Sequence, residues 1–160
     1  MNNNNMSYKY INTALTEISK LTRSYANEWD HVYGMFTFEF YPNKMTSVNA
    51  YLEKNGIYEN MILDDKFAHE LLRISGIIRN KIELDDTVSK LPDQLLFTID
   101  RATQQVDYHF VYDIADNPNY SSFDEMLYFE YHLMGLIPES KFNRKLLNNA
   151  LLYHGEKPLD

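Results

Sequence analysis

The sequence contains no cysteine. This absence excludes disulfide bonds and thiolate chemistry, and it fits a protein that works in a reducing compartment. Glycine is also scarce, with five residues in 160, and none of them belongs to a glycine-rich phosphate-binding loop. No apolar stretch approaches the length that is needed to span a membrane. We therefore expect a cytoplasmic protein without a membrane contact.

Basic side chains are missing from a long part of the second half. Between Arg101 and Lys141 there is no Lys or Arg, whereas this stretch contains seven of the acids that give the chain its net charge of −8. This balance excludes the basic surface of a nucleic-acid-binding protein and favours a cationic partner. The chain also has 13 tyrosines, a residue that combines apolar area with a hydroxyl and is common at protein interfaces.

The start of the chain, MNNNNMSYKY, has a composition of its own. It lacks a basic region followed by an apolar run, so we expect no signal peptide. We predict that residues 1–9 form a flexible Asn-rich terminus. Residues 10–160 are predicted to form a single domain, because a chain of this length is typical of one domain with a substantial core.

The hydrophobic pattern changes repeatedly between the helical and the strand period. Apolar residues at helical spacing predict four helices, over about residues 8–27, 65–78, 122–134 and 139–153. Alternation with period two predicts two hairpins, with strands over residues 35–40 and 46–52, then 95–99 and 106–112. This order predicts an α+β fold with an antiparallel sheet of about four to five strands and helices packed on one face.

Three residues carry specific signals for helix ends. Asp64 is placed to cap the second predicted helix. Ser122, with Glu125 three residues later, predicts a capping box at the start of the third. Gly135 predicts the end of that helix, since glycine readily adopts the left-handed conformation found there.

Few residues are arranged as a catalytic or metal site. The five histidines show no His-x-x-x-His spacing, and no Gly-x-Ser-x-Gly is present. Asp107 and His109 are neighbours on one strand face, and with Glu130 or His132 they would form the metal site of a small metal-dependent hydrolase. The simpler interpretation is a solvated Asp–His pair. We predict no enzyme, no catalytic residue, no metal and no cofactor, and keep the hydrolase as the alternative function.

The loop and helix start after the last predicted strand carry the residues that we predict to bind a partner. These residues are Asp113, Asp116, Tyr120, Asp124 and Glu125. Carboxylates at these positions would pair with Lys and Arg of the partner, and the tyrosine would add buried contact area. Two alternatives remain open. The acids form an ordinary surface that favours the helix dipole, or the chain is an adaptor with several partners.

Short motifs, in a particular order and spacing, resemble a known family. They are Glu28-Trp29-Asp30-His31-Val32-Tyr33 after the first predicted helix, Phe110-Val111-Tyr112-Asp113 at a strand end, and Tyr128-Phe129-Glu130-Tyr131-His132-Leu133-Met134-Gly135-Leu136-Ile137-Pro138-Glu139 at a helix end. From about Tyr10 to Leu152 this layout resembles the YezG-like immunity (antitoxin) family. The resemblance implies a small cytosolic protein that binds and neutralises a cognate secreted bacterial toxin, often a nuclease.

The residues and the resemblance lead to the same expectation. We predict a nuclease inhibitor that covers the basic active-site groove of a toxin domain with an acidic, Tyr-rich face. Nucleic acid is not expected to bind directly. The pattern leaves open the identity of the toxin, whether its substrate is DNA or RNA, and the oligomeric state.

Overall fold

The computed structural model describes residues 8–114 and 121–160, with the side chain of Ser122 left out. The chain divides into two compact units, one that ends at Val111 and one that starts at Tyr112.

The prediction of a single domain over residues 10–160 thus differs from the observed division. The predicted strand over residues 106–112 ran across the boundary, so its pattern gave no sign of a division there. Of the predicted flexible terminus, residues 1–7 lie outside the described residues, and Lys9 already begins a helix.

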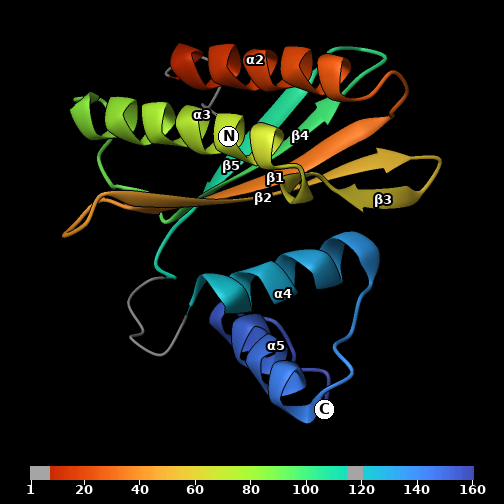
Figure 1. Cartoon of the computed structure of the whole chain (residues 1–160). Coiled ribbons are helices and arrows are strands. Elements are labelled where there is room, and N and C mark those ends of the chain that lie inside the picture. Colours follow the sequence, from red (N-terminus) through yellow and green to blue (C-terminus); the bar gives the residue numbers. More distant parts are fainter. Residues whose placement is uncertain (1–7, 115–120) are drawn as a thin grey trace. The chain divides into compact units, whose positions relative to one another are not determined.

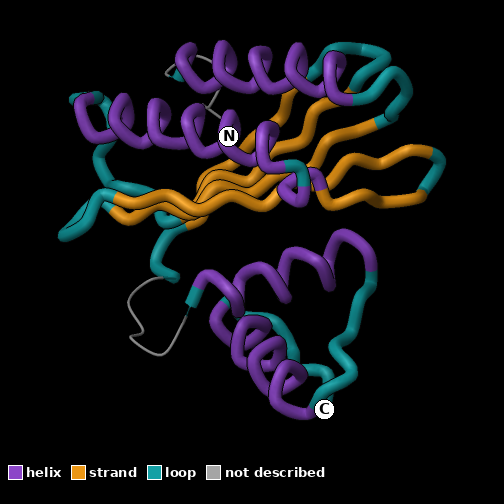
Figure 2. Tube along the Cα trace, in the orientation of Figure 1, coloured by secondary structure: helices purple, strands orange, loops and turns teal. Residues whose placement is uncertain are grey.

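The first unit is a five-stranded antiparallel sheet with two helices on one face (Figures 1 and 2). The strand order is β3-β2-β1-β4-β5. The strands are β1 (His31–Glu39), β2 (Met45–Lys54), β3 (Ile57–Asn60), β4 (Gln94–Asp100) and β5 (Val106–Val111), and the helices are α2 (Lys9–Tyr25) and α3 (Asp65–Leu84). A 3-10 turn, η1 (Met61–Leu63), precedes α3. The predicted α+β class with an antiparallel sheet is confirmed.

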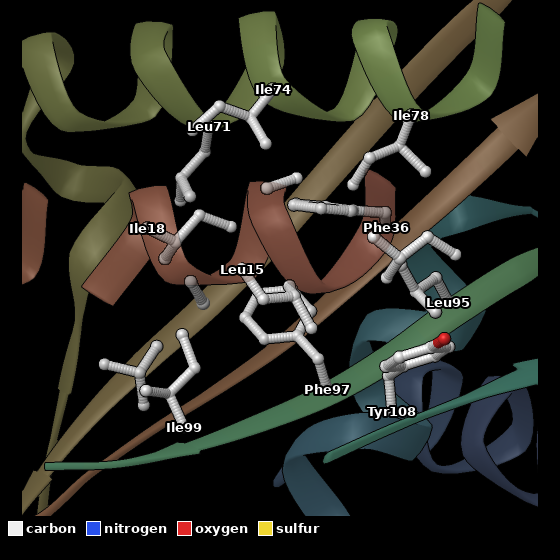
Figure 3. Close-up of a cluster of buried hydrophobic side chains, with 14 of the residues drawn as sticks. Leu15, Ile18, Phe36, Leu71, Ile74, Ile78, Leu95, Phe97, Ile99 and Tyr108 are labelled. Carbon is white, nitrogen blue, oxygen red and sulfur yellow. The ribbon is translucent and has the colours of Figure 1, made fainter. Parts of the chain in front are cut away.

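The core of this unit lies between the helices and the sheet (Figure 3). Strand residues of alternate positions point to the helices, and each helix supplies one apolar stripe. The largest contributors that Figure 3 labels are Leu15, Ile18, Phe36, Leu71, Ile74, Ile78, Leu95, Phe97, Ile99 and Tyr108. All were on predicted apolar faces, so the periodicity alone identified this core.

The third strand was not predicted. It follows the turn at Asn55 and Gly56, whose φ angles of 54° and 76° place both residues in the left-handed region. Such a pair favours a tight hairpin. The sequence indicated this turn, but β3 has only four residues, too few to show an alternating pattern. It pairs with the end of β2 and forms one edge of the sheet.

The second unit contains two helices, α4 (Ser122–Met134) and α5 (Lys141–Tyr153). They share a small core of Leu127, Leu147 and Leu151. Phe123 and Phe142 belong to the apolar pattern that predicted these helices, but they are 42% and 70% exposed. A pair of short helices buries one narrow seam, which leaves the outer members of a broad apolar stripe in solvent.

Two of the three predicted helix-end signals are confirmed. Asp64 accepts a hydrogen bond from the Phe67 amide at 2.8 Å, and Gly135 ends α4 with a φ of 69°. The predicted capping box was wrong by one residue, since Ser121, and not Ser122, caps α4 together with Asp124. Both serines have an acid three residues later, so the pattern fits either register.

Gly34 provides a test of how tightly the core is packed. A Cβ atom at this position would lie 2.0 Å from the ring of Phe97, its neighbour on β4. We expect Gly34→Ala to lower the free energy of unfolding by about 1–3 kcal/mol, because the buried ring has to move. Urea unfolding followed by the fluorescence of Trp29, the only tryptophan, measures this loss.

Gly76→Ala is the matched control. Gly76 lies within α3 and has no atom near the position of a new Cβ. The same substitution there should raise the free energy of unfolding by roughly 0.5–1 kcal/mol, because alanine favours the helix. Equal effects at both positions would contradict the tight contact between Gly34 and Phe97.

Candidate functional site

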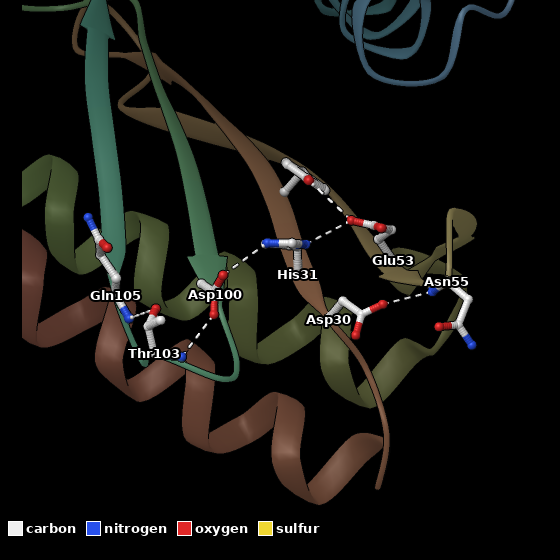
Figure 4. Close-up of polar contacts among 8 residues, drawn as sticks. Asp30, His31, Glu53, Asn55, Asp100, Thr103 and Gln105 are labelled. Atoms are coloured by element: carbon white, nitrogen blue, oxygen red, sulfur yellow. Dashed lines mark hydrogen bonds and ion pairs between the residues drawn. The ribbon is translucent and has the colours of Figure 1, made fainter.

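Polar side chains from three adjacent strands meet on the sheet face opposite to α2 and α3 (Figure 4). His31 on β1 lies between Glu53 on β2 and Asp100 on β4. Its Nδ1 is 2.8 Å from Glu53 Oε1, and its Nε2 is 3.1 Å from Asp100 Oδ2. The Tyr33 hydroxyl donates to Glu53 at 3.2 Å. We call these four residues the His31 cluster.

The local sequence explains why the cluster forms. Val32 is fully buried under the helices, so its neighbours His31 and Tyr33 project from the other face of β1. The strand register then places Glu53 and Asp100 directly opposite His31, one on each side. Cross-strand neighbours of this kind are close enough for direct side-chain contact.

Backbone amides fix one acid of the cluster, Asp100, and one acid beside it, Asp30. Asp100 Oδ1 accepts from the Thr103 amide at 2.9 Å, in the turn between β4 and β5. Asp30 Oδ2 accepts from the Asn55 amide at 2.8 Å, in the turn between β2 and β3. Both carboxylates therefore have defined positions at the same end of the sheet, and Figure 4 shows them on either side of His31.

The environment sets the charge of the cluster. The hydrogen bond from the Thr103 amide, with His31 as a further contribution, lowers the pKa of Asp100. Burial, together with the nearby Glu53 carboxylate, raises the pKa of Tyr33 from 10.0 to about 12. At neutral pH Asp100 is ionised and Tyr33 keeps its proton for the bond to Glu53. Both ring nitrogens of His31 face a carboxylate, and Glu53 and Asp100 give the cluster its negative charge.

The surroundings of the cluster are acidic on balance. Asp107 follows on β5, opposite Thr98 of β4 and on the same face. Of the basic neighbours, Lys54 forms an ion pair with Glu28, whereas Arg101 donates to the neutral Asn27 carbonyl at 3.1 Å and keeps its charge. This surface suits the ammonium or guanidinium group of a partner.

The residues of the alternative hydrolase are divided between the two units. Asp107 and His109 project from the same face of β5, as the sequence predicted, but Glu130 lies on α4 in the second unit. Across residues 8–114 and 121–160, no group of three or more His, Asp or Glu side chains is placed to hold a metal ion. The structure thus adds no support to that alternative.

The five predicted partner-binding residues differ in their position and in their exposure to solvent. Asp116 and Tyr120 lie outside the described residues. Asp113 is exposed just after β5, with a φ of 63°. Asp124 and Glu125 are 3% and 2% exposed, contrary to what a contact residue requires.

Asp124 and Glu125 have roles inside the second unit. Asp124 exchanges hydrogen bonds with Ser121 in the capping box of α4. Glu125 Oε1 is 2.9 Å from His154 Nε2, and the His154 ring stacks on Tyr128 with 3.7 Å between the ring centroids. These carboxylates stabilise the unit itself, so we remove both from the predicted contact set.

The chain was also compared with known proteins. No model of a known protein family matches it, and no curated protein sequence matches it. Within the described part of the chain, no helix is both long and apolar enough to cross a membrane. The resemblance to the YezG-like family therefore stays a prediction.

Tyr33 gives a test of the cluster by alkaline titration. Its folded-state pKa is raised above the ordinary value, so its stabilising contribution is fully present below pH 10.0 and is lost as pH rises through about 12. The difference in tyrosinate absorbance between the wild type and Tyr33→Phe should therefore appear near pH 12. In a Glu53→Gln background this difference should shift to lower pH, and an unchanged titration would contradict the contact with Glu53.

Glu125 gives a test of the second unit. We expect Glu125→Lys to destabilise this unit by roughly 3 kcal/mol or more, because His154 loses its carboxylate and a new charge is buried. Amide hydrogen exchange in α4 and α5 reports the loss. The exposed Glu139, changed to Lys, is the control and should have little effect. Similar exchange in both variants would show that Glu125 is not an internal residue.

Proposed function

We propose that this chain is an immunity protein that binds a cognate secreted toxin, with a basic nuclease as the partner, and neutralises it. The observation that carries the proposal is the His31 cluster, where fixed carboxylates and a tyrosine hydroxyl share one face of a rigid sheet. The net charge of −8 and the family resemblance support it. The cluster replaces Asp124 and Glu125 in the proposed contact surface, while Asp113, Asp116 and Tyr120 stay predicted contacts.

The proposed mechanism is occlusion of the toxin. A nuclease binds phosphates with Lys and Arg side chains, and these same side chains complement Glu53, Asp100 and their acidic neighbours. The negative field accelerates encounter, and the tyrosine supplies contact area that excludes water. Since the bound groove is no longer open to nucleic acid, inhibition requires no reaction by the inhibitor.

The first experiment tests neutralisation itself. The expected partner is the C-terminal domain of a large secreted protein encoded directly upstream of this chain. Expression of that domain should stop growth, and co-expression of the chain should restore it through a one-to-one complex of the purified proteins. Continued toxicity without complex formation would refute the proposed function.

A charge experiment then tests the surface. Glu53→Gln with Asp107→Asn removes two negative charges at and beside the His31 cluster. We expect association with the toxin domain to slow by about fivefold at roughly 0.01 M salt, and by less at roughly 0.15 M, where screening is stronger. Stopped-flow fluorescence measures both rates.

The matched control removes the same charge from the other side of the sheet. Glu70→Gln with Glu83→Gln changes two exposed or half-exposed carboxylates of α3. Its association rate should stay within about twofold of the wild type. If both double variants slow association equally, only the net charge matters and the cluster is not the contact surface.

A further inference from the structure

The turn between β2 and β3 contains the only Asn-Gly pair of the sequence, Asn55-Gly56. Both residues are exposed, and their φ angles of 54° and 76° lie in the left-handed region. This conformation is uncommon for Asn and free of steric hindrance for Gly. The Asn55 backbone amide donates to the Asp30 carboxylate at 2.8 Å, which places the turn beside the His31 cluster (Figure 4).

An Asn-Gly pair reacts with itself without an enzyme. The backbone nitrogen of Gly56 attacks the side-chain amide carbon of Asn55, and the new N–C bond closes a succinimide ring. The side-chain nitrogen leaves as ammonia and takes up the proton of the Gly56 amide. Because both groups belong to neighbouring residues, the attack is intramolecular and favoured by proximity.

Water then opens the succinimide ring. Attack of water at the former side-chain carbonyl breaks the new N–C bond and leaves Asp at position 55. Attack at the former backbone carbonyl breaks the original peptide bond and leaves isoaspartate, in which the chain continues through the side-chain carbons. The sum of the steps converts an amide and water into a carboxylic acid and ammonia, so no oxidant or reductant is needed.

The structure of the turn favours attack by the Gly56 nitrogen. Gly56 has no side chain, and apart from its chain neighbours no atom lies within 4 Å of the position of a Cβ there, so water and base have access. Its amide lies outside the pairing of β2 with β3, which begins at Lys54 and Ile57. β3 is an edge strand of four residues, and an element of this kind opens locally at a small cost in free energy. The turn is thus able to reach the geometry of ring closure.

Two other Asn residues are exposed and lie outside helices and strands, but both lack this combination. Asn27 is followed by Glu28. Asn43 is followed by a Lys, and its side-chain nitrogen donates to Glu39 at 3.4 Å. A side chain on the following residue hinders the attack of that residue's nitrogen. Asn27 and Asn43 therefore serve as controls within the same molecule.

We infer that Asn55 is a site of spontaneous deamidation, at which the chain gains a carboxylate beside the His31 cluster. Water is the only co-reactant, and the inference does not depend on the proposed function. Both products place a negative charge in the turn that the Asp30 carboxylate holds, and these like charges repel each other. Isoaspartate also lengthens the backbone between Lys54 and Ile57, which disturbs their pairing.

Incubation of the folded full-length chain, followed by peptide mapping, tests the inference. Mass spectrometry detects the change from amide to acid, and electron-transfer fragmentation distinguishes isoaspartate from Asp. We expect modification at Asn55 to be about tenfold faster than at Asn27 or Asn43, because Gly56 has no Cβ. The rate should rise with pH, since the attacking nitrogen has to lose its proton. An unmodified Asn55, or equal rates at the three residues, would overturn the inference.

Gly56→Asn is the matched variant. Asn also adopts the left-handed conformation, and the space around the Cβ position is open, so we expect the turn to be kept. The new side chain lies next to the attacking nitrogen and should slow the modification of Asn55 about tenfold. Amide hydrogen exchange of β3 in the fresh variant verifies the hairpin. If the hairpin is intact and the rate at Asn55 is unchanged, the Gly56 nitrogen is not the nucleophile and the inference is wrong.

Hydrogen exchange of the aged wild type tests the structural consequence. The amides of β3 should exchange several-fold faster in the isoaspartate form than in fresh protein, whereas α4 and α5 should be unchanged. Asn55→Asp adds the charge without the longer backbone and should have a smaller effect. Equal exchange of β3 in fresh protein and in the isoaspartate form would refute the predicted loss of pairing. The toxin has no part in these measurements, so their failure leaves the proposed function standing.

Discussion

Strand β1 is the element on which the first unit depends, because its two faces make different contacts. It is the middle strand of the sheet and pairs along most of its length with β2 and β4. One face buries Val32, Phe36 and Phe38 against the helices. The other carries His31 and Tyr33 into contact with their cross-strand partners. A shift of one residue in register would expose the core and bury the polar cluster, so packing and charge fix the same alignment.

Much of the fold was visible in the sequence, and the reasons are local. Among the described residues, four of the five strands and all four α-helices follow from apolar spacing. Asp64 and Gly135 lie at the helix ends that their residue types predict. Two of the failed predictions are also local in origin. β3 is too short for a pattern, and Ser121 and Ser122 offer equivalent caps. The division at Val111 is a property of long-range contacts, which periodicity does not record.

The candidate site was harder to predict because its members are far apart in the chain. His31 lies 22 residues from Glu53 and 69 from Asp100, and only the register of the sheet brings them together. A composition argument instead favoured the dense run of acids near Glu125, where the carboxylate proved to bind His154. The only available signal was the alternation of His31 and Tyr33 with a buried valine. The density of charge in a sequence therefore says little about where charge faces solvent.

The turns at Asp30 and Asp100 connect the proposed contact surface to the folding of the chain. Each carboxylate holds a backbone amide of a neighbouring turn with one oxygen, and the other oxygen of Asp100 faces His31. The same atoms thus organise the chain locally and contribute to the field at the surface. A lineage that adapts to a new partner is consequently less free to change these two positions than Glu53 or Asp107. Specificity is expected to diversify first where a carboxylate has no turn to maintain.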